Sequence, residues 1–107
     1  MVHYADKLKV VEVNEIAYFM AIEKGVFMVT NDNHRYSIDY TLEKLEEILN
    51  PIKFFRVNRK FLVSFTAIKS MYTYSKSRVK LELIPNPETD VIVSSERSAE
   101  FKQWLNK

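Results

Sequence analysis

The chain of 107 residues has 47% hydrophobic and 28% charged residues, a net charge of +2 and a pI near 8.8, so we expect one folded domain and exclude a disordered tail. It contains no cysteine, which excludes disulfides and thiolate chemistry and fits a reducing compartment. Its longest apolar run, Ile16 to Ile22, is too short to cross a bilayer and no leader pattern is found, so we expect a cytoplasmic protein with no membrane partner.

The N-terminal part of the chain predicts an antiparallel meander of short strands. Residues 1–6 are expected to form a loose arm, and the domain is expected to span residues 7–107. Glu15 to Ile22 is apolar on both faces, which predicts a strand covered on both sides. Turn signals lie at Glu23-Lys24-Gly25, which holds the only glycine, and at Asn31-Asp32-Asn33. The strands are predicted at residues 7–13, 15–22, 26–30 and 34–38.

A helix is predicted after this meander, because the apolar spacing changes to that of one helical stripe. The stripe consists of Leu42, Leu45, Ile48 and Leu49. Thr41 is placed to cap the helix, Glu43 lies near the positive end of its dipole, and Asn50-Pro51 ends it.

The rest of the chain is again rich in strands, predicted at residues 54–57, 61–65, 68–74, 78–84 and 90–94. A terminal helix follows, and we expect Ser94 or Ser95 to cap it. Its apolar face consists of Phe101, Trp104 and Leu105. The predicted fold class is therefore mostly β, with small antiparallel β-sheets of about nine strands and two short helices.

The middle of the chain is purely basic. Between Glu47 and Glu82 there is no acidic residue, and the basic ones are Lys53, Arg56, Arg59, Lys60, Lys69, Lys76, Arg78 and Lys80. A field of one sign on rigid strands favours a polyanionic partner, and solubilising charges on exposed strands are the alternative. Asn58 tolerates a turn conformation, so we expect the chain to bend there and to project Arg59 and Lys60 outward.

The cations of this interval suit different contacts. Arg59 can bind guanine or phosphate through two donors, whereas Lys60 is a point charge that suits phosphate. Arg56 lies within a predicted strand. A structural role, in which it pairs with Glu43 or Glu82, is at least as good an interpretation as a contact with the polyanion.

The ordered set of motifs resembles the LytTR family of bacterial DNA-binding domains, from Lys7 to Leu105. The motifs are Phe54–Ser64 followed by Ala67-Ile68-Lys69, the strand Ile16–Phe19, the helix Leu42–Leu45, and the series Val79–Leu83, Val91–Ser94 and a helix with Phe101 and Leu105. The resemblance implies a LytTR-like fold whose inter-strand loops enter successive major grooves on one face of duplex DNA. It also implies the effector domain of a two-component response regulator, following a receiver domain. We therefore expect sequence-specific binding to duplex DNA, at a repeated site occupied by two copies, without a cofactor.

Carried over by position, three loops would face the DNA: Met20–Gly25, Asn58-Arg59-Lys60 and Ser94–Arg97. The predicted DNA-binding residues are Lys24, Asn58, Arg59, Lys60, Ser94, Ser95 and Arg97. Ser94 and Ser95 would present backbone N–H groups to a phosphate at a helix start, with simple capping as the alternative. Ser95 stands where the family more usually has arginine, so Arg97 must carry any base contact there. Asn58 stands where histidine is commoner, and Lys60 replaces a small polar residue.

Three other classes of function were weighed against DNA binding. An enzyme is disfavoured, because two isolated histidines and one glycine form no zinc spacing and no phosphate-cradling loop. A single-stranded RNA-binding β-sheet is suggested by Lys60–Phe65, which has some similarity to the aromatic strand of an RNA-recognition motif but lacks its glycines. A protein-interaction module with an incidental basic face is the third. Exposed strand aromatics would favour RNA, and contacts borne by loops would favour duplex DNA.

Overall fold

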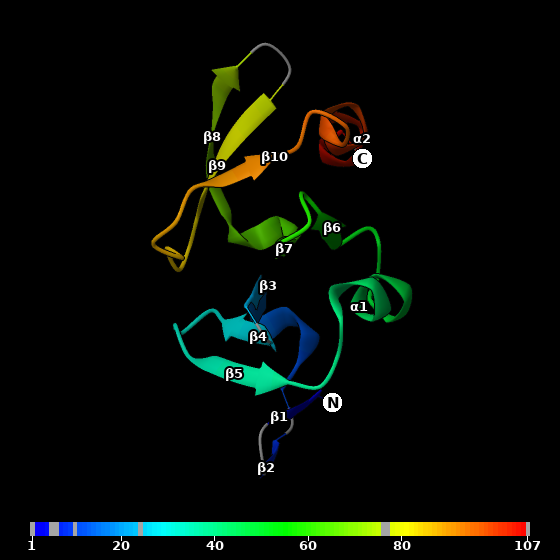
Figure 1. The fold of residues 1–107 in the computed structure, drawn as a ribbon, viewed down its shortest axis with the longest axis vertical. Coiled ribbons are helices and arrows are strands. Elements are labelled where there is room, and N and C mark those ends of the chain that lie inside the picture. The colour runs from blue at the N-terminus through cyan, green and yellow to red at the C-terminus, as the bar shows by residue number, and fades with distance from the viewer. Residues whose placement is uncertain (1, 5–6, 10, 24, 76–77, 107) are drawn as a thin grey trace.

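The computed structural model describes residues 2–4, 7–9, 11–23, 25–75 and 78–106, which fold into two antiparallel sheets and two helices (Figure 1). The strands are β1 (Val2–Tyr4), β2 (Lys7–Lys9), β3 (Ile16–Ile22), β4 (Gly25–Thr30), β5 (Arg35–Ile38), β6 (Phe54–Arg56), β7 (Phe61–Ser64), β8 (Ile68–Ser75), β9 (Arg78–Leu83) and β10 (Val91–Val93). The helices are α1 (Leu42–Ile48) and α2 (Ser98–Leu105). The seven-stranded sheet has the order β2-β1-β5-β4-β3-β7-β6, and the three-stranded sheet has the order β10-β9-β8.

The predicted class, mostly β with antiparallel sheets and two short helices, is confirmed. The described residues hold ten strands rather than about nine, because β1 forms inside the segment that we expected to be an arm. It pairs with β2, and Tyr4 lies opposite Ile38 of β5, so residues 2–4 belong to the sheet. The domain boundaries themselves stay a prediction.

The strand predicted over residues 7–13 is shorter in the structure, where β2 ends at Lys9. Val13–Glu15 instead form a short 3-10 turn. Glu12 and Glu15 hold this turn, because the backbone N–H of Glu12 donates to Oε1 of Glu15 at 2.9 Å and the N–H of Glu15 donates to the carbonyl of Glu12 at 2.9 Å. This reciprocal capping competes with extension of the strand.

Strand β3 lies at the centre of the fold, with both faces covered as its sequence predicts. Tyr18 and Met20 contribute to a core that includes the second sheet and Phe101 of α2. Phe19 contributes to a second core, together with Leu42 and other side chains of α1. Strand β3 therefore joins the two cores.

The two helices begin differently from one another. Thr41 caps α1 as predicted, because its Oγ1 accepts a hydrogen bond from the backbone N–H of Lys44 at 3.1 Å. The prediction that Ser94 or Ser95 caps α2 is wrong, since that helix begins at Ser98 and Arg97 is its N-cap. The chain first turns through residues 95–97, because the carbonyl of Ser94 accepts from the N–H of Arg97 at 3.0 Å and from Oγ of Ser98 at 3.0 Å.

Tyr18 provides a pH-dependent test of this core. Its ring is fully buried, its hydroxyl donates to the carbonyl of Pro85 at 2.7 Å, and burial raises its pKa to about 12. The unfolded chain loses this proton near pH 10, so the stabilisation is complete below about pH 10 and is lost as the pH rises toward about 12. We expect the melting temperature to fall less between pH 10 and 12 in Tyr18→Phe than in the wild type. Equal losses in the two proteins, measured by circular dichroism, would contradict this.

None of the helices in the described part of the chain is long and apolar enough to span a membrane.

Candidate nucleic-acid-binding surface

The three loops singled out in the sequence lie side by side. The backbone N–H of Ala21, at the end of β3, donates to the carbonyl of Lys60 at 2.8 Å. The N–H of Ser94 donates to the carbonyl of Val57 at 3.0 Å. Figure 1 shows the β6–β7 connection next to the β10–α2 connection. We call residues 20–23, 25, 58–60 and 94–97 the loop surface.

Asn58 shapes the middle loop with its own side chain. Its Oδ1 accepts from the backbone N–H of Lys60 at 2.7 Å and of Phe61 at 2.9 Å, which closes the bend that the sequence predicts. Its Nδ2 donates to the carbonyl of Ile92 in β10 at 2.8 Å. Asn58 therefore has a structural role that the sequence did not reveal, because the partner lies 34 positions away. The predicted contact between Asn58 and DNA stays a prediction.

These bonds give Asn58 a measurable effect on stability. We expect Asn58→Ala to lower the free energy of unfolding by about 1–3 kcal/mol, because it leaves half-buried backbone groups without partners. Asn58→Asp keeps an acceptor for the two backbone N–H groups but turns a carboxylate oxygen toward the carbonyl of Ile92, so the stability that it loses reports on the contact with β10. Urea unfolding measures both values, and equal stability of wild type and Asn58→Ala would contradict the assignment.

Arg59 and Lys60 extend from this bend toward solvent. Both side chains are exposed, as the sequence predicts. Within the described part of the chain, neither side chain forms a salt bridge or hydrogen bond with another residue. Two cations that have no partner among the described residues are thus available to an external anion.

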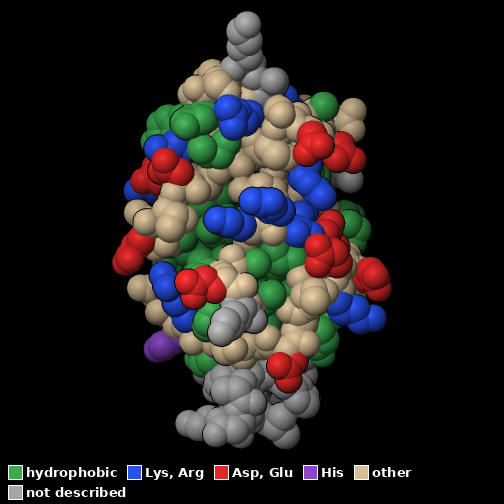
Figure 2. All heavy atoms as spheres, viewed as in Figure 1, with side chains coloured by type: hydrophobic (Ala, Val, Ile, Leu, Met, Phe, Trp, Pro, Cys, Tyr) green, Lys and Arg blue, Asp and Glu red, His purple; other side chains and the backbone are tan. Residues whose placement is uncertain are grey.

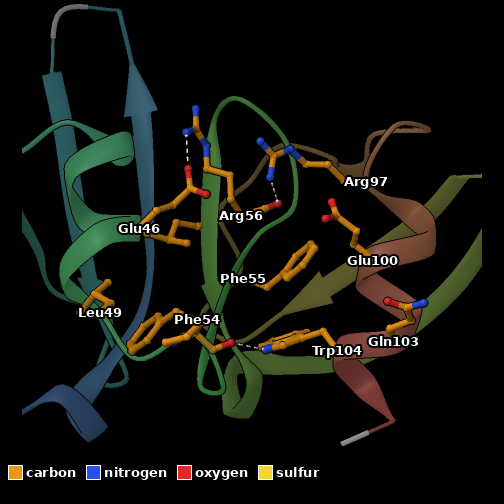
Figure 3. Close-up of a pocket in the computed structure, with 11 residues that line it drawn as sticks. Glu46, Leu49, Phe54, Phe55, Arg56, Arg97, Glu100, Gln103 and Trp104 are labelled. Carbon is orange, nitrogen blue, oxygen red and sulfur yellow. Dashed lines mark hydrogen bonds and ion pairs between the residues drawn. The ribbon is translucent and has the colours of Figure 1, made fainter.

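Arg97 and the two serines occupy the neighbouring loop. Arg97 is half-buried, and its Nη1 donates to the carbonyl of Arg56 at 3.2 Å (Figure 3). The N–H of Ser94 is already bonded to the carbonyl of Val57, which corrects the expectation that this N–H would meet a phosphate. Ser95 is exposed. DNA contacts by the side chains of these three residues stay predictions.

The third loop is the β3–β4 turn. Ile22 lies opposite Gly25, which confirms the predicted hairpin. Glu23, with φ of 47°, takes the left-handed conformation, whereas Gly25 has no positive φ and is the first residue of β4. Lys24, predicted to bind DNA, lies outside the described residues.

The basic interval of the sequence is partly neutralised in space. Antiparallel pairing brings Lys69 to within 3.9 Å of Glu82. Lys80 lies 3.4 Å from Asp90 across the β9–β10 pair. The interval is therefore free of acids only along the chain, and its cations do not form one uniform field.

Arg56 pairs with α1, which confirms one of its two expected partners. Its Nη1 lies 3.3 Å from Glu43, as the sequence allowed, and 2.9 Å from Glu46, which the sequence analysis missed. Glu82, the other expected partner, pairs with Lys69 instead. The spacing of three residues between the two glutamates was the available signal, because it places both on one face of a helix.

Basic and acidic side chains lie close to one another on the surface of the molecule. Figure 2 shows Lys and Arg side chains gathered across the middle of one face, with Asp and Glu side chains toward its margins. A hollow of about 520 Å³ at the loop surface is lined by residues 20–23, Asn58 and Lys60 of that surface, together with Arg35 and the acidic Glu88 and Asp90. A polyanion would be repelled by the acidic side chains of this hollow, so the exposed Arg59 and Lys60 are the part of the loop surface that attracts it.

The strand compared with an RNA-recognition motif displays only one of its two aromatic side chains, Phe65, which follows β7 and is 50% exposed. Phe61 is only 4% exposed, and β7 is buried throughout. Tyr72 and Tyr74 are exposed but lie on β8. Because β7 itself presents no exposed aromatic face, the loops are the candidate interface. No group of three or more His, Asp or Glu side chains that could hold a metal ion occurs among the described residues.

Comparison with known proteins gives two findings. A family profile described as the LytTr DNA-binding domain matches residues 6–106. The fold is similar to a solved LytTr DNA-binding domain of a protein described as a methyl-accepting/DNA response regulator from Bacillus cereus, with a TM-score of 0.84 and 23% sequence identity over 99% of this chain and 94% of that chain. At this identity the likeness concerns the fold alone. No curated protein matches the sequence.

Proposed function

This chain belongs to the LytTR family of DNA-binding domains, and from that premise we propose that it binds duplex DNA sequence-specifically through the loop surface. The observation that carries the proposal is the contact among the three loops, with Arg59 and Lys60 exposed and unpaired within the described residues. Loops on a rigid sheet lose little conformational entropy when they bind, because their geometry is already fixed.

Each loop residue has a role in the proposed complex. Arg59 donates two hydrogen bonds to the major-groove edge of guanine, and Lys60 contacts a backbone phosphate. Arg97 reaches the same or the next groove, and the β3–β4 turn enters a neighbouring one. Asn58 holds the middle loop in the conformation that these contacts require.

The proposal includes the setting that the resemblance implies. The domain is the effector of a transcriptional response regulator, with a receiver domain upstream in the full-length protein. Two copies occupy a repeated site, and the location is cytoplasmic, where bacterial DNA lies. No cofactor or catalytic step takes part.

Selection of bound sequences from random duplex DNA tests the function. We expect one sequence class to be enriched, and the enriched duplex to bind at least about a thousandfold more tightly than a scrambled duplex at physiological salt. Tighter binding to a single-stranded RNA of the same sequence would overturn the proposal in favour of an RNA-binding sheet. Absence of binding to any nucleic acid would favour a protein-interaction module.

A further inference from the structure

Among the described residues, Arg56 is the one charged residue that is buried, with 8% of its surface exposed. Burial of a guanidinium is unfavourable unless its charge is paired and its donors are bonded. The surroundings of Arg56 meet both needs, and no buried side-chain N or O atom of the described residues lacks a partner. Such a cluster imposes a definite geometry on every group that takes part in it.

One side of the guanidinium holds α1 and the other holds the middle loop. Nη1 binds the carboxylates of Glu43 and Glu46. Nε donates to the carbonyl of Asn58 at 3.0 Å, and Nη2 donates to the carbonyl of Arg59 at 2.9 Å. Figure 3 shows Arg56 between Glu46 of α1 and Arg97 of the β10–α2 connection.

The two loop carbonyls are those of Asn58 and Arg59, which lie immediately before Lys60 in the chain. Fixing both of them sets the direction in which the chain leaves Arg56, while Asn58 closes the same bend from inside. The carbonyl of Arg56 itself accepts from Arg97, so the backbone of this residue also meets the neighbouring loop. Arg56 is thus bonded to both loops and to α1.

We propose that Arg56 is a positioning residue for DNA binding: it does not contact DNA, but its guanidinium holds the 58–60 loop in the binding conformation, anchored on Glu43 and Glu46. This inference rests on the proposed function. It assigns a role to α1, whose Glu43 and Glu46 carboxylates pair with the guanidinium. The backbone N–H of Glu43 and, to a smaller extent, Arg56 hold the pKa of the Glu43 carboxylate below its usual value.

The variant Arg56→Lys separates positioning from charge. It keeps the positive charge beside the two glutamates, but its single ammonium cannot match the planar fork that reaches both loop carbonyls and α1 together. We expect Arg56→Lys to weaken binding to the selected duplex about tenfold, as expected for the loss of a charge-assisted hydrogen bond. It should also lower the salt dependence of the affinity, because Lys60 no longer meets its phosphate.

A double-mutant cycle distinguishes this role from a general loss of stability. In the Arg59→Ala/Lys60→Ala background, Arg56→Lys should have no further effect on affinity, because the side chains that it positions are gone. Lys80→Ala, which removes a paired cation of the second sheet, serves as the control and should leave affinity nearly unchanged. An equal loss in both backgrounds, with an unchanged salt slope, would overturn the proposal.

Amide hydrogen exchange without DNA gives an independent measurement. The N–H groups of Lys60 and Phe61 should exchange faster in Arg56→Lys, while the N–H of Phe19 in β3 should not change. Unaltered exchange at Lys60 and Phe61 would overturn the positioning role even if the variant binds DNA weakly. If the wild type bound no DNA, the proposed function would fail while the exchange result still decided whether Arg56 holds the loop.

A second variant covers the case in which Arg56→Lys does not fold. Glu46→Gln keeps the shape of the anchor and removes its charge, and Glu46 is partly exposed, so the variant should fold. It should show the same faster exchange at Lys60 and a smaller loss of affinity. Wild-type exchange and affinity in Glu46→Gln would contradict the anchoring by α1.

Discussion

Replacing Arg59 and Lys60 together by Ala is expected to weaken binding to the selected duplex by about a hundredfold or more. Two free-energy losses combine, that of the bidentate Arg59–guanine contact, which contributes about 1–3 kcal/mol, and that of the Lys60–phosphate contact. Each 1.4 kcal/mol is about tenfold in affinity. The single variants should differ in kind. Arg59→Ala should relax the preference for one base pair, whereas Lys60→Ala should weaken all sequences alike and reduce the salt slope by about 1.

Fluorescence anisotropy at several salt concentrations measures these effects, with Lys53→Ala as the matched control. Lys53 is exposed, carries the same charge and lies at the other end of β6 from the loop. It should lose little affinity. If Lys53→Ala and Lys60→Ala behave alike, attraction is diffuse and the loop has no special role.

Replacing Phe101 by Ala is expected to lower the free energy of unfolding by about 3–5 kcal/mol, because a fully buried ring is lost and a cavity remains. The ring centroid of Phe101 lies 5.6 Å from that of Phe55 in β6 and 5.8 Å from that of Trp104. These contacts join α2 to the sheet that carries the middle loop. Domains of this kind are stable by only about 5–15 kcal/mol, so the loss is a large share of the total.

Urea unfolding of Phe101→Ala, compared with Phe65→Ala, measures this contribution. Phe65 is 50% exposed and touches Trp104 edge-on at 5.6 Å, so its truncation should cost well under half as much. Similar losses for the two variants would show that α2 is not held by its buried face.

The regular elements were predictable where their signals are local. The cap at Thr41 and the apolar stripe after it define α1, and the two apolar faces of Ile16–Ile22 define a covered strand. The start of α2 was mispredicted, because the N–H of Ser94 pairs with Val57, a partner far away in sequence. The strand β1 was missed for a similar reason, since its sheet position depends on β5.

The site was predictable in parts. The bend at Asn58 and the exposure of Arg59 follow from residue types next to each other. The charge pattern was misleading, since only the register of β8, β9 and β10 reveals that Lys69 and Lys80 have acidic partners. The four-way bonding of Arg56 also needs the fold, because α1 and the middle loop are separate along the chain.

The central claim is that three adjacent loops form one surface that binds duplex DNA. Its most direct test is to titrate isotopically labelled protein with the selected duplex and to follow every backbone amide resonance by NMR. The account predicts the largest shift changes in residues 20–25, 58–60 and 94–97, with the exposed strand β8 unaffected. Changes concentrated on β8 and β9, with the three loops unperturbed, would contradict it.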